Sequence, residues 1–272
     1  MVTRLPGQPN VSDLVLSKIH KGAAILNLAE LHPFSGSNEG VFYTFNGSDA
    51  EYHSGTDTTD KKISDDQLSE VTIRTKTLYK WLEFSDEEFQ DRRVIANAIE
   101  NKTPYDLYRT LDKDAVGGKS LVPTSGFDGY TATPLEVGET AASWLEAVDA
   151  VSDNGYEATG IILDNSFRKV LRAAFVENTN TNQLGTSIRD GIYVGDVPVF
   201  FRNLGESVGV VGDFSQFVVA YNNNLNVVHY DPNSDAYQGR RDKNAIKVSW
   251  RVGVGVATQE AFQPITLATA GE

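Results

Sequence analysis

One stretch of this 272-residue chain constrains its fold more than any other, because residues 71–84 keep the two-residue period of a strand throughout. The odd positions through Trp81 carry apolar side chains or Thr, and Arg74, Lys76 and Lys80 alternate against them. At about 3.3 Å per residue such a strand spans about 45 Å, well beyond the usual length of about five or six residues. A small domain is therefore not expected to cover all of it.

A second strand at residues 41–45 precedes the long one, and the pair predicts a two-stranded arm. An isolated hairpin is only marginally stable in water unless something packs on it. Another copy of the chain is the expected partner. Arg74, Lys76 and Lys80, predicted to share one face of the arm, are candidate inter-subunit contacts to acidic neighbours.

The segment between these strands, residues 46–70, is polar and carries seven Asp or Glu against Lys61 and Lys62. Such a composition predicts a solvated or mobile tip. Alternatively, Asn46-Gly47 can close a local hairpin onto Tyr52, which would shorten the arm.

The overall composition excludes several classes of protein. A formal charge of −13 argues against nucleic-acid binding driven by phosphate contacts, which needs a basic face. The absence of Cys excludes disulfides and thiolate zinc sites. The N-terminus lacks the apolar run of a signal peptide, and no stretch approaches the roughly 18 apolar residues of a membrane span. The expectation is a protein that stays in the cytosol until assembly or release.

Helices are predicted in the first half of the chain. An extended segment at residues 1–12 precedes a helical pattern that can dock on a neighbour or on its own core. Ser85 and Glu88 form a capping box that opens a helix. Thr103 and Pro104 then supply a second N-cap and an N1 proline, giving a long, bent helix that ends near Gly117.

The remainder of the chain predicts an α+β fold. Helices at residues 143–151 and 167–174 flank a short apolar strand at 160–163, and the triple Asn222-Asn223-Asn224 is expected to form a turn. The strands predicted in the last third are residues 192–194, 197–201, 217–221, 225–230 and 246–256.

No catalytic, cofactor-binding or metal site is expected. Gly205-Glu206-Ser207-Val208-Gly209 matches a nucleophile elbow, and Asp213 and His229 follow it in hydrolase order. An elbow needs a helix after the serine, however, and the β-branched and Gly-rich residues after Ser207 are a poor helix start. A serine hydrolase using Ser207 is thus a minor alternative to a plain turn. Residues 231–242 lack the Gly of a calcium loop, and the four His residues lack metal-ligand spacing.

Several short segments, taken in order, carry a family resemblance. The chain resembles the major capsid proteins of tailed bacteriophages with the HK97 fold. The matching segments are Ser85-Asp86-Glu87-Glu88 with the helix end Asp114-Ala115-Val116-Gly117-Gly118, Gly191-Ile192-Tyr193-Val194-Gly195-Asp196-Val197-Pro198-Val199, Val211-Gly212-Asp213-Phe214, and Asn244-Ala245-Ile246-Lys247-Val248 with Glu260-Ala261-Phe262.

The resemblance implies four parts and a structural, non-enzymatic role. These are an N-terminal arm at 1–38, an extended β-hairpin loop at 39–84, a peripheral domain with a long spine helix from 85–120 and 240–272, and an axial domain at 121–239. In that family, hexamers and pentamers tile an icosahedral shell around a dsDNA genome, and the extended loop lies over a neighbouring subunit. An encapsulin-like shell that holds cargo enzymes is the alternative within the same fold.

The same resemblance implies partners and a location. A portal, a possible decoration protein and enclosed dsDNA without sequence-specific binding are expected, in a virion capsid assembled in the host bacterial cytoplasm, with no cofactor and no membrane. The residues before the arm are too few for a scaffolding segment, which predicts a separate scaffolding protein or none.

A covalent seal between subunits is not expected. Some family members join a loop Lys to an Asn of another subunit with the help of a Glu on the C-terminal strand. Lys61 or Lys62 can supply the amine and are candidate inter-subunit contacts, but residues 246–258 contain no carboxylate. The sequence therefore predicts a non-covalent shell.

Overall fold

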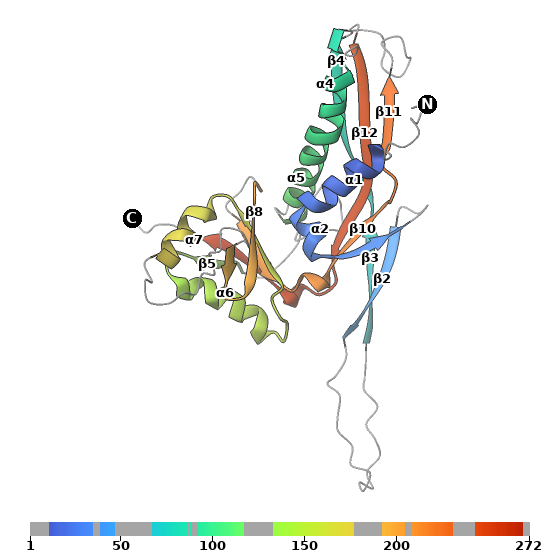
Figure 1. Ribbon diagram of the computed structural model, residues 1–272. Helices are drawn as coiled ribbons and strands as arrows, with labels where there is room; N and C mark the ends of the chain where they lie inside the picture. Colours follow the sequence, from blue (N-terminus) through green and yellow to red (C-terminus); the bar gives the residue numbers. More distant parts are fainter. Residues whose placement is uncertain are drawn as a thin grey trace.

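The computed structural model forms two lobes and a projecting arm (Figure 1). The larger lobe holds the longest strand and the N-terminal helices, and the smaller lobe holds a separate sheet with two helices of its own. The residues that the structure describes are 11–34, 39–46, 67–85, 87–88, 92–116, 133–176, 192–204, 208–230 and 243–268.

The larger lobe is built around strand β12 (Lys243–Val256). On one side β12 pairs antiparallel with β4 (Lys76–Ser85). On the other side it pairs antiparallel with β11 (Asn226–Tyr230) and then with β10 (Phe217–Tyr221). Strand β1 (Glu30–Pro33) adds to β10 in parallel and completes this sheet.

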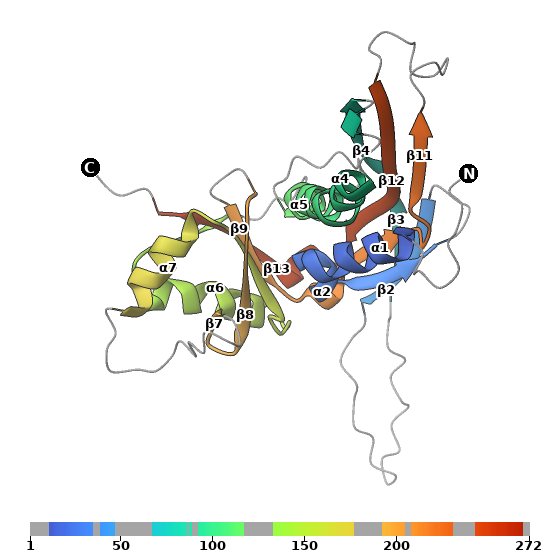
Figure 2. The same ribbon diagram turned by 45° about the horizontal axis from the view of Figure 1, so that its top comes forward.

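Helices cover one face of the larger sheet (Figure 2). Two of them come from the N-terminal segment and the others form one long helical stretch after β4. They are α1 (Val11–Gly22), α2 (Ala24–Leu28), α4 (Arg92–Asn97), the π-helical turn η1 (Ala98–Lys102) and α5 (Thr103–Val116).

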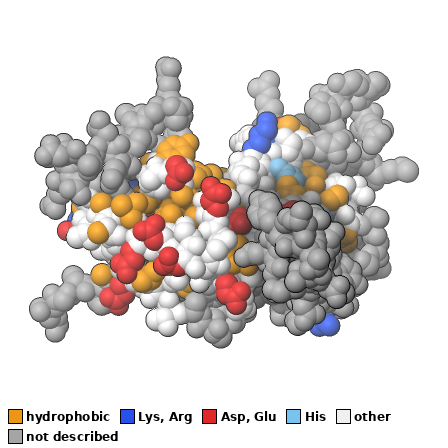
Figure 3. Space-filling model, turned by 90° about the horizontal axis from the view of Figure 1, so that it is seen from below, with side chains coloured by type: hydrophobic (Ala, Val, Ile, Leu, Met, Phe, Trp, Pro, Cys, Tyr) orange, Lys and Arg blue, Asp and Glu red, His pale blue; other side chains and the backbone are white. Residues whose placement is uncertain are grey.

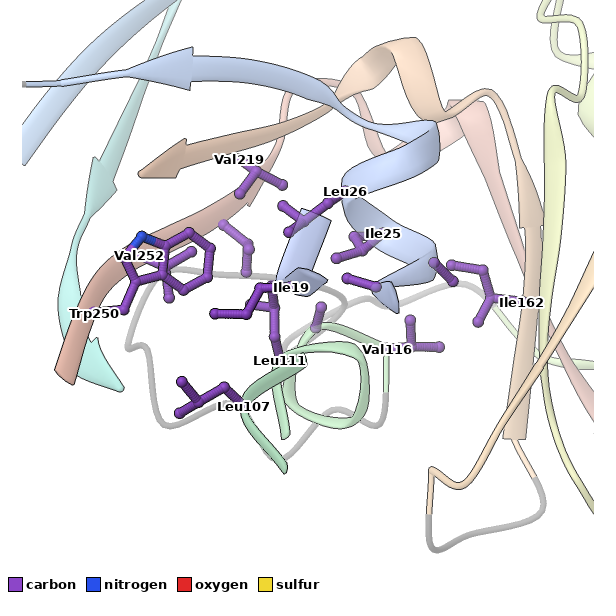
Figure 4. Packing of buried hydrophobic residues seen from close by; sticks show 14 of the residues in the cluster. Ile19, Ile25, Leu26, Leu107, Leu111, Val116, Ile162, Val219, Trp250 and Val252 are labelled. Atoms are coloured by element: carbon purple, nitrogen blue, oxygen red, sulfur yellow. The ribbon is translucent and has the colours of Figure 1, made fainter. Parts of the chain in front are cut away.

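The core of the larger lobe lies between that sheet and those helices (Figure 4). Alternate residues of β12, including Trp250 and Val252, point into it with the two-residue period of a strand. Leu107 and Leu111 of α5 lie one helical turn apart and meet Ile19 of α1 there. The N-terminal helices therefore dock on their own chain, which was one of the two predicted outcomes.

The smaller lobe contains a six-stranded sheet with α6 (Ala141–Asp153) and α7 (Phe167–Val176) on one face. Trp144 of α6 and Phe167 of α7 are fully buried, and their ring centroids lie 6.0 Å apart. The strand order is β5 (Leu135–Val137), β13 (Phe262–Leu267), β9 (Val208–Gly212), β6 (Gly160–Asp164), β8 (Val197–Arg202) and β7 (Ile192–Val194). Two 3₁₀ turns connect strands of the two lobes. The turn η2 (Phe214–Gln216) follows β9, and the turn η3 (Gln259–Ala261) precedes β13.

The arm is a separate antiparallel sheet of two strands, β2 (Glu39–Asn46) and β3 (Gln67–Arg74). Its register runs from Glu39 opposite Arg74 to Asn46 opposite Gln67, so the hairpin predicted from residues 41–45 is confirmed. The local hairpin considered for Asn46-Gly47 and Tyr52 lies outside the described residues, apart from Asn46 itself, which pairs with Gln67.

The capping box is confirmed, but the second helix start is not. The Ser85 hydroxyl accepts the N–H of Glu88 at 3.3 Å, and the Glu88 carboxylate accepts the N–H of Ser85 at 2.9 Å. Thr103, predicted as an N-cap, has helical dihedrals of −64° and −46°, because the π-helical turn carries the helix through Pro104 without a restart. The described part of the helix extends to Val116, next to the predicted end near Gly117.

Sheet membership differs from the predicted division of the chain in two places. Strands β10 and β11, expected in the axial part, lie in the sheet of β12, whereas β13, expected in the peripheral part, lies in the smaller lobe. The Asn222-Asn223-Asn224 segment does not reverse the chain, because β10 and β11 follow one another in the same direction along β12. Long-range pairing decides these placements and local composition does not.

Candidate assembly surfaces

The long strand predicted at residues 71–84 is two strands that separate at Thr75. Before Thr75, β3 pairs with β2 of the arm and with no other described strand, and after it β4 pairs with β12 along its whole length. The chain itself therefore covers the β4 half of the long strand, which agrees with the expectation that a small domain does not cover all of it. The other half leaves the body with the arm (Figure 1).

A close backbone approach fixes the root of the arm. At Gly253 of β12, a Cβ atom would lie 2.8 Å from the carbonyl oxygen of Arg74 and 2.9 Å from Cγ2 of Ile73. Ile73 is fully buried against Val218 and Ala220 of β10. Glycine is thus required at position 253 for the arm to cross β12 at this depth.

The predicted contact residues fall in different environments. Arg74 ends β3 and Lys76 begins β4, and both are exposed. Lys80 lies in the sheet and not in the arm, with its ammonium 3.2 Å from the Asp106 carboxylate of α5. Lys80 thus has an acidic partner within its own chain. Lys61 and Lys62 lie outside the described residues.

Strand β4 also presents aromatic side chains on the sheet face opposite the helices. Tyr79 is 56% exposed and Trp81 is 38% exposed, whereas Leu82 and Phe84 point into the core. The Lys247 ammonium lies 5.3 Å from the Tyr79 ring centroid and 5.6 Å from that of Trp81. These residues form an exposed aromatic surface on the larger lobe.

A buried aspartate links α5 to the N-terminal helices. The side chain of Asp112 is only 1% exposed, and its carboxylate accepts the N–H groups of Ala24 and Ile25 at 3.0 and 3.1 Å. Those two groups open α2, whose N-cap Ala23 has no side chain able to accept them. Asp112 therefore caps a helix that is distant from it in the sequence.

Arg202, the last residue of β8, joins the smaller lobe to the same centre. Its Nε donates to Asp112 at 2.8 Å, and its Nη2 donates to the carbonyl oxygen of Gly22 at 2.9 Å. Burial raises the pKa of Asp112, and the Ala24 and Ile25 N–H groups together with Arg202 oppose part of that rise. The Asp112–Arg202 pair therefore connects α2, α5 and both lobes.

A lysine holds α1 against the π-helical turn. Pro104 has no N–H, so the carbonyl oxygen of Glu100 loses its usual i+4 donor. The Lys18 ammonium donates to that carbonyl at 3.0 Å and to the Asn101 side chain at 2.7 Å. The bulged part of the long helix is thus a docking point for the N-terminal helix.

Replacing Lys18 with methionine is expected to lower the free energy of unfolding by about 1 kcal/mol, because two hydrogen bonds from one ammonium are lost while most of the aliphatic stem remains. Denaturant titration of the unassembled subunit measures this. Lys21→Met, at an exposed position of the same helix, is the control and should change stability by less than about 0.5 kcal/mol. Equal effects of both substitutions would refute the docking role of Lys18.

The residues suspected of catalysis do not form a catalytic centre in the described part of the chain. Asp213 caps η2 by accepting the N–H of Ser215, and His229 Nε2 lies 3.1 Å from the Asn244 side-chain oxygen. Ser207 and the candidate calcium loop lie outside the described residues, but the residues after Ser207 form strand β9 and not the helix that a nucleophile elbow needs. Among the residues described, no group of three His, Asp or Glu has the geometry to hold a metal ion. Nor does any described helix have the length and apolarity needed to cross a bilayer.

A family model decides the identity of the chain. The model for the phage capsid family matches residues 8–193, which is more than half of the sequence. The chain belongs to the phage capsid family. No curated protein sequence matches this family member.

Solved structures share the fold of this phage capsid family member at low sequence identity. One from Gordonia phage Cozz aligns with a TM-score of 0.69 and 18% identity over 91% of this chain and 87% of that one. One from Mycobacterium phage Ogopogo aligns with a TM-score of 0.62 and 17% identity over 98% of this chain and 97% of that one. The capsid of an empty GTA particle aligns with a TM-score of 0.59 and 17% identity over 99% of this chain and 94% of that one. The fold is therefore the α+β, HK97-like fold of phage capsids, as the resemblance implied.

Two features that position the candidate assembly surfaces were not predicted from the sequence: the close approach at Gly253 and the buried Asp112–Arg202 pair. The alternation Val252-Gly253-Val254-Gly255-Val256 was a usable signal, because glycine inside a strand often marks a close backbone approach. A signal for the buried centre also existed, since Asp112 adjoins the apolar stripe of α5. Its partner was not predictable, because Arg202 lies 90 residues away.

Proposed function

We propose that this chain is the structural subunit of a phage shell, assembling through hexamers and pentamers into an icosahedral capsid around dsDNA. One observation carries the proposal: β3 leaves the sheet at Thr75 and continues with β2 as an arm of only two strands. A hairpin of this kind needs a surface to pack on. Family membership supports a second copy of the chain as that surface.

The geometry suits an arm that overlaps a neighbour. Strand β4 anchors one end of the ribbon in the body, and the contact at Gly253 sets the angle at which β2 and β3 leave it. The exposed face of Tyr79 and Trp81 offers a second surface for contacts in the shell. In this proposal the larger lobe is the peripheral domain with its spine helix, and the smaller lobe is the axial domain at the capsomer centre.

The shell encloses DNA and assembles with partner proteins. A charge of −13 suits a container that encloses dsDNA without binding it tightly. Assembly takes place in the host cytoplasm with a portal and a separate scaffolding protein, and a decoration protein can attach later. The shell is held by non-covalent contacts, and the subunit has no catalytic role.

Negative-stain microscopy of the purified protein tests this proposal. Closed particles, tubes or separate capsomers are expected, and a protein that stays monomeric at all concentrations would contradict it. Denaturing electrophoresis of mature particles addresses the non-covalent contacts, because a single band near 29.8 kDa is expected. A ladder of multimers would instead show a covalent seal.

A further inference from the structure

The two helices of the smaller lobe carry opposite charges. Helix α6 exposes Glu146, Asp149 and Asp153 and contains no Lys, Arg or His. Helix α7 contains no acidic residue, and it exposes three cations. These are Arg168, Lys169 and Arg172.

The helices lie over opposite halves of one sheet. Helix α6 contacts β5, β13 and β9, which form the first half of the strand order. Helix α7 contacts β6, and the Arg168 guanidinium lies 4.8 Å from the ring centroid of Phe201 in β8. The smaller lobe therefore has an acidic side and a basic side.

The charges on both sides lack partners within the described part of the subunit. None of Glu146, Asp149 and Asp153 forms an ion pair with any residue that the structure describes, and the same holds for Lys169 and Arg172. The two helices carry opposite charges but do not pair with one another, so within the part of the chain that the structure describes both sets are available to another molecule.

The acidic side also has a shape that fits long cationic side chains. A shallow hollow on α6 has a floor of small and apolar residues and a rim of carboxylates, and acidic and apolar side chains alternate over the same lobe in Figure 3. The aliphatic stem of Lys or Arg can lie on such a floor while its charged end meets the rim. The residues lining the hollow are Leu135, Ala142, Leu145, Glu146, Asp149, Ala150 and Asp153.

We propose that the acidic face of α6 in one copy of the chain receives the basic face of α7 in the next copy. The two surfaces differ, so the contact is head-to-tail, and repeated contacts of this kind close into a ring when the rotation allows it. The proposal rests on the proposed shell function and names the contact between smaller lobes within a capsomer. The occupant is a second copy because the chain carries both complementary surfaces.

Charge reversals on each side test this contact. Lys169→Glu with Arg172→Glu makes both sides acidic, and Glu146→Lys with Asp149→Lys makes both sides basic. Each doubly substituted chain alone is expected to lose at least about tenfold in assembled fraction by mass photometry, because attraction becomes repulsion at every repeat of the interface. The loss should be largest at low salt.

Mixing supplies the decisive readout. An equimolar mixture of the all-acidic and all-basic chains should form rings again, because each acidic side then meets a basic one. Only even-numbered rings can alternate, so hexamers are expected without pentamers. A single chain with all four reversals should assemble alone. Mixtures and four-fold variants that stay unassembled would overturn the proposal, provided that circular dichroism shows folded subunits.

Further controls separate the possible failures. Arg109→Glu with Lys113→Glu makes the same charge change on exposed positions of α5 and should leave the smaller-lobe contact intact, so mixing it with the all-basic chain should give no rescue. If α7 faces nucleic acid instead, Lys169→Glu with Arg172→Glu will assemble normally and lose retention of plasmid DNA, which overturns the proposal. Unassembled wild-type protein contradicts the shell function itself, whereas normal assembly of both reversed chains contradicts only this interface.

Discussion

Replacing Arg202 with methionine is expected to lower the free energy of unfolding by about 3 kcal/mol, because Asp112 would keep its buried charge without a counter-ion. The figure lies at the low end for buried pairs because the Arg202 side chain is 25% exposed. The loss also frees the Gly22 carbonyl and weakens the connection between the lobes. Denaturant titration of the unassembled subunit measures the effect.

The pH dependence identifies the cause of this loss. Burial already raises the pKa of Asp112 above 3.8, and removal of Arg202 takes away a group that lowers it. The folded variant then binds more protons than the unfolded chain, so its stability falls as pH rises from 3.8. The deficit should therefore be smallest in acid and grow toward neutral pH.

Arg172→Met provides the matched control for the loss at Arg202. Arg172 is exposed, and its replacement should change stability by less than about 0.5 kcal/mol at every pH. If Arg202→Met proves as mild as this control, Asp112 does not depend on Arg202 and the account of the buried centre is wrong.

Replacing Gly253 with alanine is expected to prevent shell assembly and to cost about 1–3 kcal/mol of stability. The added methyl would lie 2.8 Å from the Arg74 carbonyl oxygen, and backbone cannot yield as a flexible side chain can. The root of the arm must move away from β12, and β2 and β3 then leave the body at a different angle. Electron microscopy and mass photometry measure the assembled fraction.

A second glycine shows whether the substitution itself is harmful. Among the described residues, an added Cβ at Gly138 meets only Ala268, at an ordinary 3.9 Å, so Gly138→Ala should assemble normally. Normal shells from Gly253→Ala would mean that the arm does not depend on its close crossing of β12.

The sequence predicted local structure well and long-range pairing poorly. The strand period of residues 71–84 and the capping box at Ser85 depend on neighbours in the chain, and both are confirmed. The break at Thr75 was missed because it lies where the chain changes pairing partner, from β2 to β12, and these strands are far apart in the sequence. The π-helical turn was missed for a similar reason, since Lys18 supports it from another helix.

For the candidate surfaces too, the sequence predicts local features but not long-range contacts. Exposed cations at Arg74 and Lys76 were predictable from their alternation with apolar residues, whereas the pairing of Lys80 with Asp106 was not. The opposite charges of α6 and α7 are visible in the sequence. Their meaning depends on sheet order, because only the fold places the two helices on opposite halves of one sheet.

Hydrogen–deuterium exchange of the arm tests whether β2 and β3 pack on a second copy of the chain. Peptides covering Glu39–Asn46 and Gln67–Arg74 are compared in unassembled subunits and in purified shells. We expect rapid exchange in the subunit and at least about tenfold slower exchange in the shell, because packing raises the free energy of local opening. Equal exchange rates in both states would contradict it.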